Sequence, residues 1–466
     1  MISFYTSLVS QPAAVGGSLR TLCCQLPYLE GLVLTEDQRL FASTRDGVYE
    51  LLASADGSSE KRLIEVTADG VPGNCMKNGI ATDGNRLYLA CAHVQQSDNP
   101  LVRTVLRDLN DVEQTARGLL QLYMAAFTFR VDSWILDCNL KATPRAFDNR
   151  LASLPQDLAA GGIAAYVLAS GIAIDPGSGM LYLANSAPGL GAAIYRMAVH
   201  GTGDAPGRAE LWHRPPGCRP NGLKLIDGSL CYTGNGWSSA VLGRVPINAD
   251  GSAGQAEVIE IAALRLFEDF DAVRQGFVVA EPGDSTGLQV GALRFVSNAG
   301  RTIGLLRHAA LRRPCAVAVA KADSALFAAG SVLIADRHEG RVLQFVPDEP
   351  WRQWLRAGGG SGCGPDCRET RQFGVPRKLD THSTPDCAVI PRQTGQSERS
   401  VEAVRAGGAD FPLDGKLIPV SSVPDAAPAV NGVTRCTALG DIERGFRVPR
   451  AHKQNTGTPC TPTTPS

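Results

Sequence analysis

The stretch from Arg219 to Gly236 reads R-P-N-G-L-K-L-I-D-G-S-L-C-Y-T-G-N-G. A polar residue stands before a glycine at Asn221-Gly222, and a short apolar segment follows. Asp227-Gly228 then leads into a second apolar segment that begins at Leu230. Asp-Gly between two apolar runs is typical of a hairpin turn, because glycine tolerates the positive φ that the turn needs. The stretch therefore predicts two antiparallel strands, the first of which starts at a polar residue.

The same pattern occurs six times along the chain. The copies start at residues 30, 78, 170, 221, 269 and 315, so the spacings are 48, 92, 51, 48 and 46 residues. The second spacing is one repeat plus 44 residues (92 − 48 = 44). A hairpin repeated at this spacing is typical of β-propeller blades, which cannot bury both faces alone and stack around an axis. The sequence predicts an all-β, six-bladed β-propeller that occupies residues 1–355.

The inner strand of each blade places its first residue at one end of the central channel. Five of these six residues carry a side-chain oxygen; the set is Glu30, Asn78, Ser170, Asn221, Asp269 and Cys315. Asn, Ser and Asp also start strands simply as turn formers, which explains one or two copies but not a ring. We expect Asn78 and Ser170 to contact the substrate, joined by Asn185 and Asn235, which follow the second strands of blades three and four. Trp237 is expected to form an apolar wall beside them, and His93 is interpreted as an ordinary loop residue.

The overall composition excludes some classes of partner. Lys and Arg number 45, Asp and Glu 46, and the net charge is −1, so no nucleic acid or anionic membrane is indicated. No apolar run is long enough for a transmembrane helix. The N-terminus lacks a basic segment followed by a sustained apolar one, so no convincing signal peptide is present. We expect a soluble protein whose compartment and protein partners the sequence leaves unknown.

A propeller needs a strand from one terminus to close the ring, since closure removes the exposed edge between the last and first blades. Two segments are candidates for this strand: Ile2–Val9 and Ser18–Cys24. In blade one, the third and fourth strands are predicted at Gly47–Leu52 and Lys61–Val66.

Two regions lie outside the repeat. Residues 95–155 contain Leu101, Val105, Leu109 and Val112 at three- and four-residue steps, which predicts a helical insertion between blades two and three. Such an insertion is either a lid that gates substrate or a surface addition, and both interpretations stay open. Residues 356–466 are rich in Gly, Pro, Ser and Thr without periodicity, which predicts a disordered, low-complexity tail.

The chain has 13 cysteines, and an odd count excludes complete internal pairing. Cys75, Cys91, Cys231 and Cys315 fall in or beside predicted strands. We expect them to be free and to pack as small buried apolar side chains.

Four motifs resemble a known family. They are Glu30-Gly31, Pro220-Asn221-Gly222-Leu223, Glu268-Asp269-Phe270 and R-V-P-I-N-A-D-G-S-A-G at 244–254. Together they are similar to the SMP-30/gluconolactonase/LRE-like group of regucalcin-type lactonases, over roughly residues 20 to 346. The resemblance implies one divalent cation in the channel, held by Glu30, Asn221 and Asp269. This chain departs from the family at Ser170, where a further Asn is usual, and at Leu168, where an Arg is usual.

Oxygen ligands suit a hard cation, Ca²⁺ first, with Mg²⁺, Mn²⁺ or Zn²⁺ as alternatives. Such an ion would polarise a lactone or ester carbonyl, and Asp269 would also serve as the catalytic general base. The hypothesis is a calcium-dependent lactonase or esterase acting on a small-molecule sugar lactone or related ester. The alternative is a non-catalytic propeller that binds a small molecule or a protein.

Overall fold

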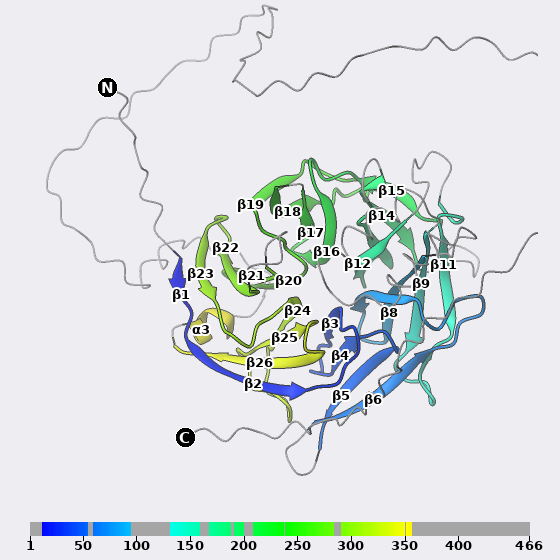
Figure 1. The fold of residues 1–466 in the computed structure, drawn as a ribbon. Helices are drawn as coiled ribbons and strands as arrows, with labels where there is room; N and C mark the ends of the chain where they lie inside the picture. Colours follow the sequence, from blue (N-terminus) through cyan, green and yellow to red (C-terminus); the bar gives the residue numbers. More distant parts are fainter. Residues whose placement is uncertain are drawn as a thin grey trace, which may run out of the picture. The chain divides into compact units, whose positions relative to one another are not determined.

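The computed structural model describes residues 12–54, 59–94, 131–158, 167–187, 191–199, 208–236, 238–283, 290–349 and 351–356. Within these residues, six sheets are arranged around a central axis, each with its first strand innermost (Figure 1). The predicted six-bladed propeller is confirmed.

In blades one to three, the strands are arranged in chain order from the axis outward. Blade one contains β3 (Gly31–Leu34), β4 (Leu40–Ser43), β5 (Val48–Ala53) and β6 (Ser59–Val66), with the short β10 (Ala146–Phe147) added parallel to β6. Blade two contains β7 (Met76–Thr82), β8 (Arg86–Val94), β9 (Val131–Asn139) and β11 (Asn149–Leu154). Blade three contains β12 (Ala169–Asp175), β13 (Met180–Asn185), β14 (Ala193–Ala198) and β15 (Glu210–His213).

Blades four to six complete the ring. Blade four contains β16 (Arg219–Ile226), β17 (Ser229–Asn235), β18 (Ser239–Pro246) and β19 (Glu257–Ala263). Blade five contains β20 (Phe270–Val273), β21 (Gly276–Glu281), β22 (Ala292–Ser297) and β23 (Thr302–Leu306), with β1 (Ala13–Ala14) added parallel to β23. Blade six contains β24 (Pro314–Val319), β25 (Val332–Asp336), β26 (Arg341–Pro347) and the N-terminal β2 (Gly17–Cys23).

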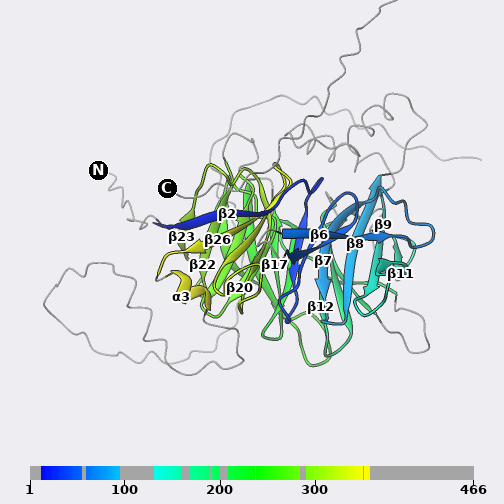
Figure 2. The same ribbon diagram turned by 90° about the horizontal axis from the view of Figure 1, so that it is seen from below.

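Strand β2 closes the ring. It pairs antiparallel with β26, so the outermost strand of blade six comes from the N-terminal part of the chain (Figures 1 and 2). This confirms the second of the two predicted closing segments, Ser18–Cys24. The first, Ile2–Val9, lies outside the described residues.

The predicted helical insertion needs a correction. Within 95–155, residues 131–139 and 149–154 are the strands β9 and β11, because blade two needs two more strands after its inner hairpin. Residues 95–130, which connect β8 to β9, lie outside the described residues. The tail is predicted at 356–466; Arg356 is the last residue of a helix, and residues 357–466 lie outside the described residues.

The described part of the chain ends in one short helix, α3 (Trp351–Arg356). Its two tryptophans, Trp351 and Trp354, pack against Phe295 of blade five with ring centroids 5.3 and 5.8 Å apart. The helix therefore belongs to the propeller, close to the predicted boundary at residue 355.

The hydrophobic core is divided among the contacts between neighbouring blades. Six clusters of buried side chains are found in the described residues, and each combines two adjacent blades. The cluster between blades six and one includes Leu333 and Val342 of blade six, together with Leu32 and Leu40 of blade one. Each blade is therefore stabilised by burial against both neighbours rather than within itself.

In blades two, three and four the polar-glycine pairs that define the repeat are β-bulges. Pairing with the second strand shifts at Asn78-Gly79 in β7, at Ser170-Gly171 in β12 and at Asn221-Gly222 in β16. A bulge re-aims a side chain out of the normal alternation, and here the polar side chain is directed into the channel.

The glycine of each pair is required because the next blade lies very close. A Cβ atom on Gly31 would lie 2.8 Å from the carbonyl oxygen of Asn78, and one on Gly222 would lie 2.9 Å from the carbonyl oxygen of Glu268. Such distances leave no space for a side chain. The repeat therefore combines a glycine that lets inner strands approach with a polar residue that faces the axis.

We predict that Gly222→Ala lowers the free energy of unfolding by about 1–3 kcal/mol, because the added methyl group meets backbone atoms that cannot move aside. Chemical denaturation of the full-length chain would measure it. Gly73→Ala is the matched control, since nothing lies within 4 Å of a Cβ atom at Gly73. Equal stability of the two variants would contradict the close approach.

Candidate functional site

The polar residues of the repeat meet in one cavity at the end of the channel. Its lining includes Glu30, Asn78, Ser170, Asn221 and Glu268, together with their following residues and Cys315. The enclosed space is about 40 Å³, enough for about three water-sized groups but not for a sugar ring. The site can hold an ion or the reacting atoms of a ligand, while the rest of the ligand would lie outside.

A larger groove of about 420 Å³ lies on blade two, lined by residues that include Asp132, Trp134 and Arg150. None of the repeat's polar residues lines it. We therefore place the candidate site in the smaller cavity, where polar side chains from successive blades converge.

The structure assigns the blade-five position to Glu268 instead of Asp269. In blades one to four, the glycine of each pair faces the carbonyl of the equivalent polar residue one blade further on. The facing carbonyls belong in order to Asn78, Ser170, Asn221 and Glu268. Asp269 thus occupies the position of the glycines, although its side chain also lines the cavity.

A sequence signal for Glu268 exists. In blades one to five the inner strand has an apolar residue next to the glycine, or next to Asp269 in blade five; these residues are Leu32, Ile80, Ile172, Leu223 and Phe270. Counting back two residues from each gives Glu30, Asn78, Ser170, Asn221 and Glu268. Aligning the copies on the apolar residue, rather than on the acidic residue next to it, identifies the correct register.

A chain of hydrogen bonds runs across blades three to five. The Ser170 hydroxyl donates to Oδ1 of Asn221, and Nδ2 of Asn221 donates to Oε2 of Glu268. Nδ2 of Asn78 donates to the carbonyl of Ala169 in blade three. The Asn221 amide is therefore held in place by a neighbour on each side.

Hydroxyl groups on the second strands join neighbouring blades directly behind the cavity. Oγ of Ser43 accepts from the Gly31 N–H and donates to the Asn78 carbonyl, both at 2.8 Å. Oγ1 of Thr233 accepts from the Gly222 N–H at 2.9 Å and donates to the Glu268 carbonyl at 2.7 Å. These bonds satisfy backbone groups that the bulges remove from normal pairing.

Two of the three carboxylates of the site are paired with a cationic side chain. Arg337 forms an ion pair with Glu30, and Nζ of Lys224 lies 3.6 Å from Oδ2 of Asp269. Burial raises the pKa of the Glu30 carboxyl to about 7, against the lowering effect of Arg337 and with a further rise from Glu268. Burial also raises the pKa of Asp269, against the effect of Lys224. The basic residues Arg337 and Lys224 were not foreseen from the sequence.

The donor set fits a divalent cation when Glu268 replaces Asp269. Glu30, Asn221 and Glu268 offer two carboxylates and an amide oxygen in one small cavity, the ligand chemistry that Ca²⁺ prefers. Oε2 of Glu30 is buried, and its partner within the described residues is the guanidinium of Arg337. No cluster of three His, Cys, Asp or Glu side chains arranged to hold a metal occurs in the described ranges. A cation at this site would therefore need the amide oxygen of Asn221 as a ligand besides the carboxylates.

Two residues predicted to bind substrate have structural roles instead. Asn185 accepts from the N–H groups of Leu168 and Ala187 and donates to the Gly191 carbonyl. Asn235 exchanges two hydrogen bonds of 2.9 Å with the backbone of Phe267. Neither lines the cavity, because both side chains are used to hold loops between strands.

The two remaining predictions have different outcomes. His93 was expected in a loop but lies within strand β8, where it is half-buried opposite Asp132; it is not part of the cavity lining. Trp237, the expected apolar wall, lies outside the described residues.

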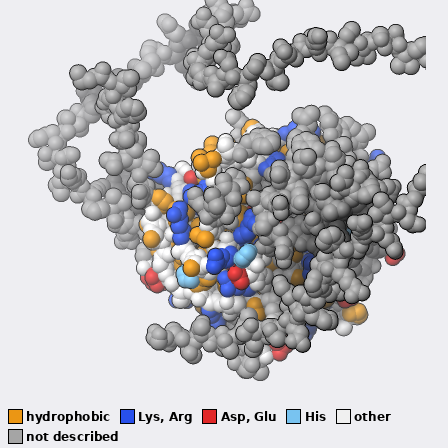
Figure 3. All heavy atoms as spheres, viewed as in Figure 1, with side chains coloured by type: hydrophobic (Ala, Val, Ile, Leu, Met, Phe, Trp, Pro, Cys, Tyr) orange, Lys and Arg blue, Asp and Glu red, His pale blue; other side chains and the backbone are white. Residues whose placement is uncertain are grey.

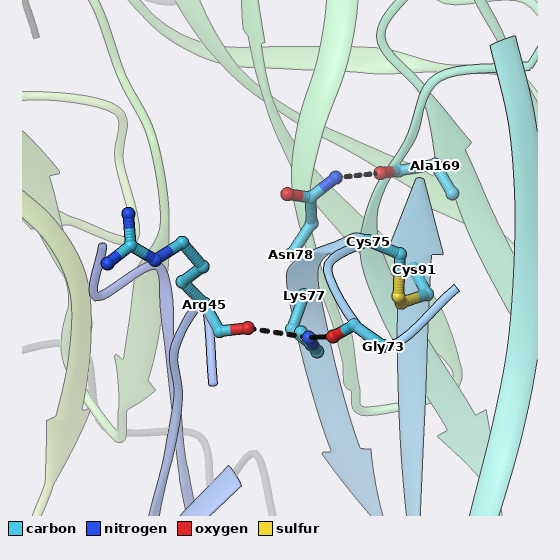
Figure 4. The surroundings of a disulfide bond; sticks show 7 residues. All are labelled: Arg45, Gly73, Cys75, Lys77, Asn78, Cys91 and Ala169. Carbon is cyan, nitrogen blue, oxygen red and sulfur yellow. Dashed lines mark hydrogen bonds between the residues drawn. A yellow bond between two sulfur atoms is a disulfide. The ribbon is translucent and has the colours of Figure 1, made fainter. Parts of the chain in front are cut away.

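Two cysteines expected to be free form a disulfide next to the site. Cys75 and Cys91 have Cα atoms 5.8 Å apart, a separation that suits a disulfide (Figure 4). The bond joins β8 to the residue before β7, the strand that carries Asn78. The buried Lys77 ammonium beside it donates to the carbonyls of Arg45 and Gly73. Cys231 and Cys315 are free and buried, as expected.

The face of the propeller drawn in Figure 3 carries many Lys and Arg side chains among its described residues and few acidic ones.

Among the described residues, no helix has the length and apolar character needed to cross a membrane.

Comparisons with known proteins give no family. No family model and no curated protein matches the sequence. Among solved structures, the chain is similar to a candidate gluconolactonase, with 12% identity, a TM-score of 0.43 and coverage of 72% of this chain and 94% of the other. It is also similar to the PQQ-bound aldose sugar dehydrogenase of Streptomyces coelicolor, with 14% identity, a TM-score of 0.45 and coverage of 72% and 100%. With identities and TM-scores this low, neither likeness carries an argument about what this chain does.

The raised pKa of Glu30 predicts a pH dependence of stability. Between about pH 4.5 and 7 the folded state binds the Glu30 proton more tightly than the unfolded chain, so this group's contribution to the free energy of unfolding decreases as pH rises. Glu30→Gln cannot titrate. We expect its stability relative to the wild type to increase over this range, measured by denaturation in the presence of a chelator.

Glu36→Gln, at an exposed turn between β3 and β4, provides the control for the loss of a carboxylate. A stability difference between Glu30→Gln and the wild type that stays constant over this pH range would show that the pKa of Glu30 is not raised.

Proposed function

We propose that the protein is a divalent-cation-dependent hydrolase that opens a sugar lactone or a related ester, with Ca²⁺ as the cation. The observation that supports it is the meeting of Glu30, Asn221 and Glu268 in one cavity with Asp269 beside them. Glu30, Asn221 and Glu268 would hold the cation. When bound, the ion would supply Lewis-acid polarisation of the substrate carbonyl and stabilise its developing negative charge.

The proposal divides between two residues the roles that the sequence had combined in Asp269. Asn221 donates to Glu268, so Glu268 is the better candidate ligand and Asp269 is left for proton transfer. A carboxylate that does not bind a cation is a stronger base, and burial raises the pKa of Asp269 further in that direction. Asp269 would take the proton from the attacking water at the mouth of the cavity.

Ser170 and Asn78 are candidate positioning residues. The Ser170 hydroxyl donates a hydrogen bond to Oδ1 of Asn221. If that oxygen binds a cation, this hydrogen bond would have to break, or the hydroxyl would have to rotate to keep it. Asn78 keeps its amide nitrogen on Ala169, which leaves its side-chain oxygen to accept a hydrogen bond from substrate or water. The small cavity admits only the reacting end of the substrate.

We predict that Glu268→Gln and Asp269→Asn differ in a diagnostic way. Glu268→Gln should weaken Ca²⁺ binding by about tenfold or more, because it removes one of two carboxylate ligands. Asp269→Asn should retain binding and lose at least about 100-fold in hydrolysis, because it removes the base. Calorimetric titration with Ca²⁺ and gluconolactone hydrolysis with and without EDTA would measure both.

Hydrolysis and Ca²⁺ binding measured on the wild-type chain distinguish the candidate functions. EDTA-sensitive hydrolysis would support the proposal, and hydrolysis unaffected by EDTA would contradict the role of the cation. Ca²⁺ binding without turnover on gluconolactone or simple esters would favour the alternative, a non-catalytic propeller that binds a small molecule or a protein. Absence of Ca²⁺ binding in the wild type would overturn the cation site.

A further inference from the structure

Blade six interrupts the ring of side-chain oxygens. Its residue at the ring position is Cys315, whose buried thiol lies 3.2 and 3.4 Å from the carbonyl oxygens of Leu29 and Ala335, two acceptors for its single S–H. Glu268 of blade five and Glu30 of blade one lie on either side of this blade, and the negative charge of Glu268 acts on Glu30. Two half-buried carboxylates on either side of a blade that adds no oxygen ligand favour a source of positive charge nearby.

Arg337 supplies that charge from blade six itself. It follows directly after β25, and its guanidinium forms an ion pair with the Glu30 carboxylate. The side chains of Arg337 and Glu30 are only 15% and 19% exposed, so water screens their interaction weakly. The guanidinium also lies over the ring of Tyr28, 5.8 Å from its centroid.

The position of Arg337 is fixed by a buried carboxylate behind it. Asp336 is fully buried and accepts from the N–H groups of Arg312, Arg313 and His338 at 3.0–3.2 Å. The N–H of Arg337 itself donates to the carbonyl of Arg313 at 3.0 Å. Two turns of blade six are thereby held together, and Arg337 is presented to Glu30 by a rigid support.

We propose that Arg337 is a built-in counter-cation that sets the cation affinity of the ring. The inference rests on the proposed function, because it concerns the same cation site. In the absence of a cation, the Arg337 guanidinium balances the charge of Glu30 and lets the ring fold. A divalent cation that binds Glu30 must do so beside a fixed positive charge, which lowers its affinity. Arg337 is a positioning and specificity residue and is not a catalytic one.

The test is a Ca²⁺ titration of the full-length, chelator-treated chain by calorimetry. Arg337→Gln removes the charge, and we expect it to bind Ca²⁺ at least about tenfold more tightly than the wild type. Arg337→Lys retains a positive charge and should bind with an affinity close to that of the wild type. A purely structural role for Arg337 would predict weaker binding for both variants.

Thermal unfolding provides a second measurement. Arg337→Gln leaves Glu30 buried without its counter-charge, so its Tm should fall in EDTA and recover in Ca²⁺ by more than any shift in the wild type. If the variant does not fold in EDTA, refolding in Ca²⁺ is the deciding experiment, and failure to recover overturns the inference. Arg145→Gln is the matched control. It removes one partner of the buried Glu50 in blade one and should change stability without changing Ca²⁺ affinity.

The outcomes separate this inference from the proposed function. If the wild type binds Ca²⁺ and Arg337→Gln binds no more tightly, the role of Arg337 is overturned and the cation site stands. If only Arg337→Gln binds, Arg337 takes the place of the cation and the cation-dependent hydrolase is overturned. If neither protein binds Ca²⁺, both are overturned.

Discussion

The close approach of neighbouring inner strands is the constraint on which this propeller depends. At Gly31 and Gly222 a single methyl group would collide with the next blade, so glycine recurs where the strands come nearest the axis. In blades two to four a bulge accommodates this approach and turns the residue before the glycine out of the strand's alternation and toward the channel. The same local distortion therefore closes the ring and creates the polar site.

The backbone groups that these bulges leave unpaired are bonded by side chains from the second strands. Ser43 and Thr233 each bridge a glycine N–H and the carbonyl of the next blade's polar residue. Because the hydroxyl joins two blades, it fixes the spacing between consecutive ring residues. Asn78 and Glu268, whose carbonyls take part, are positioned by contacts within the fold and not by a ligand.

Charge distinguishes one side of the ring from the other. Between blades three and five the polar groups satisfy each other through Ser170, Asn221 and Glu268. At blade six the ring position is an uncharged thiol, and Arg337 reaches Glu30 from the neighbouring turn. Buried carboxylates are stable only with a compensating charge, and the fold provides one without a bound ion.

Much of the architecture could be predicted from the sequence, since it follows from patterns repeated along the chain. Six hairpin signals, the glycine that follows the polar residue in blades one to four, and the second candidate for the closing strand all correspond to described elements. These features are local, because turn chemistry and strand alternation depend on residues close in sequence.

Only the tertiary structure determined which residues from distant parts of the chain contact one another. The register that places Glu268 ahead of Asp269 depends on which carbonyl faces Gly222 from the next blade. The Cys75–Cys91 disulfide, the strand identity of 131–139 and the Arg337–Glu30 pair likewise depend on neighbours brought together by folding. Sequence pattern determined the number and kind of parts; packing around a common axis determined which side chains meet.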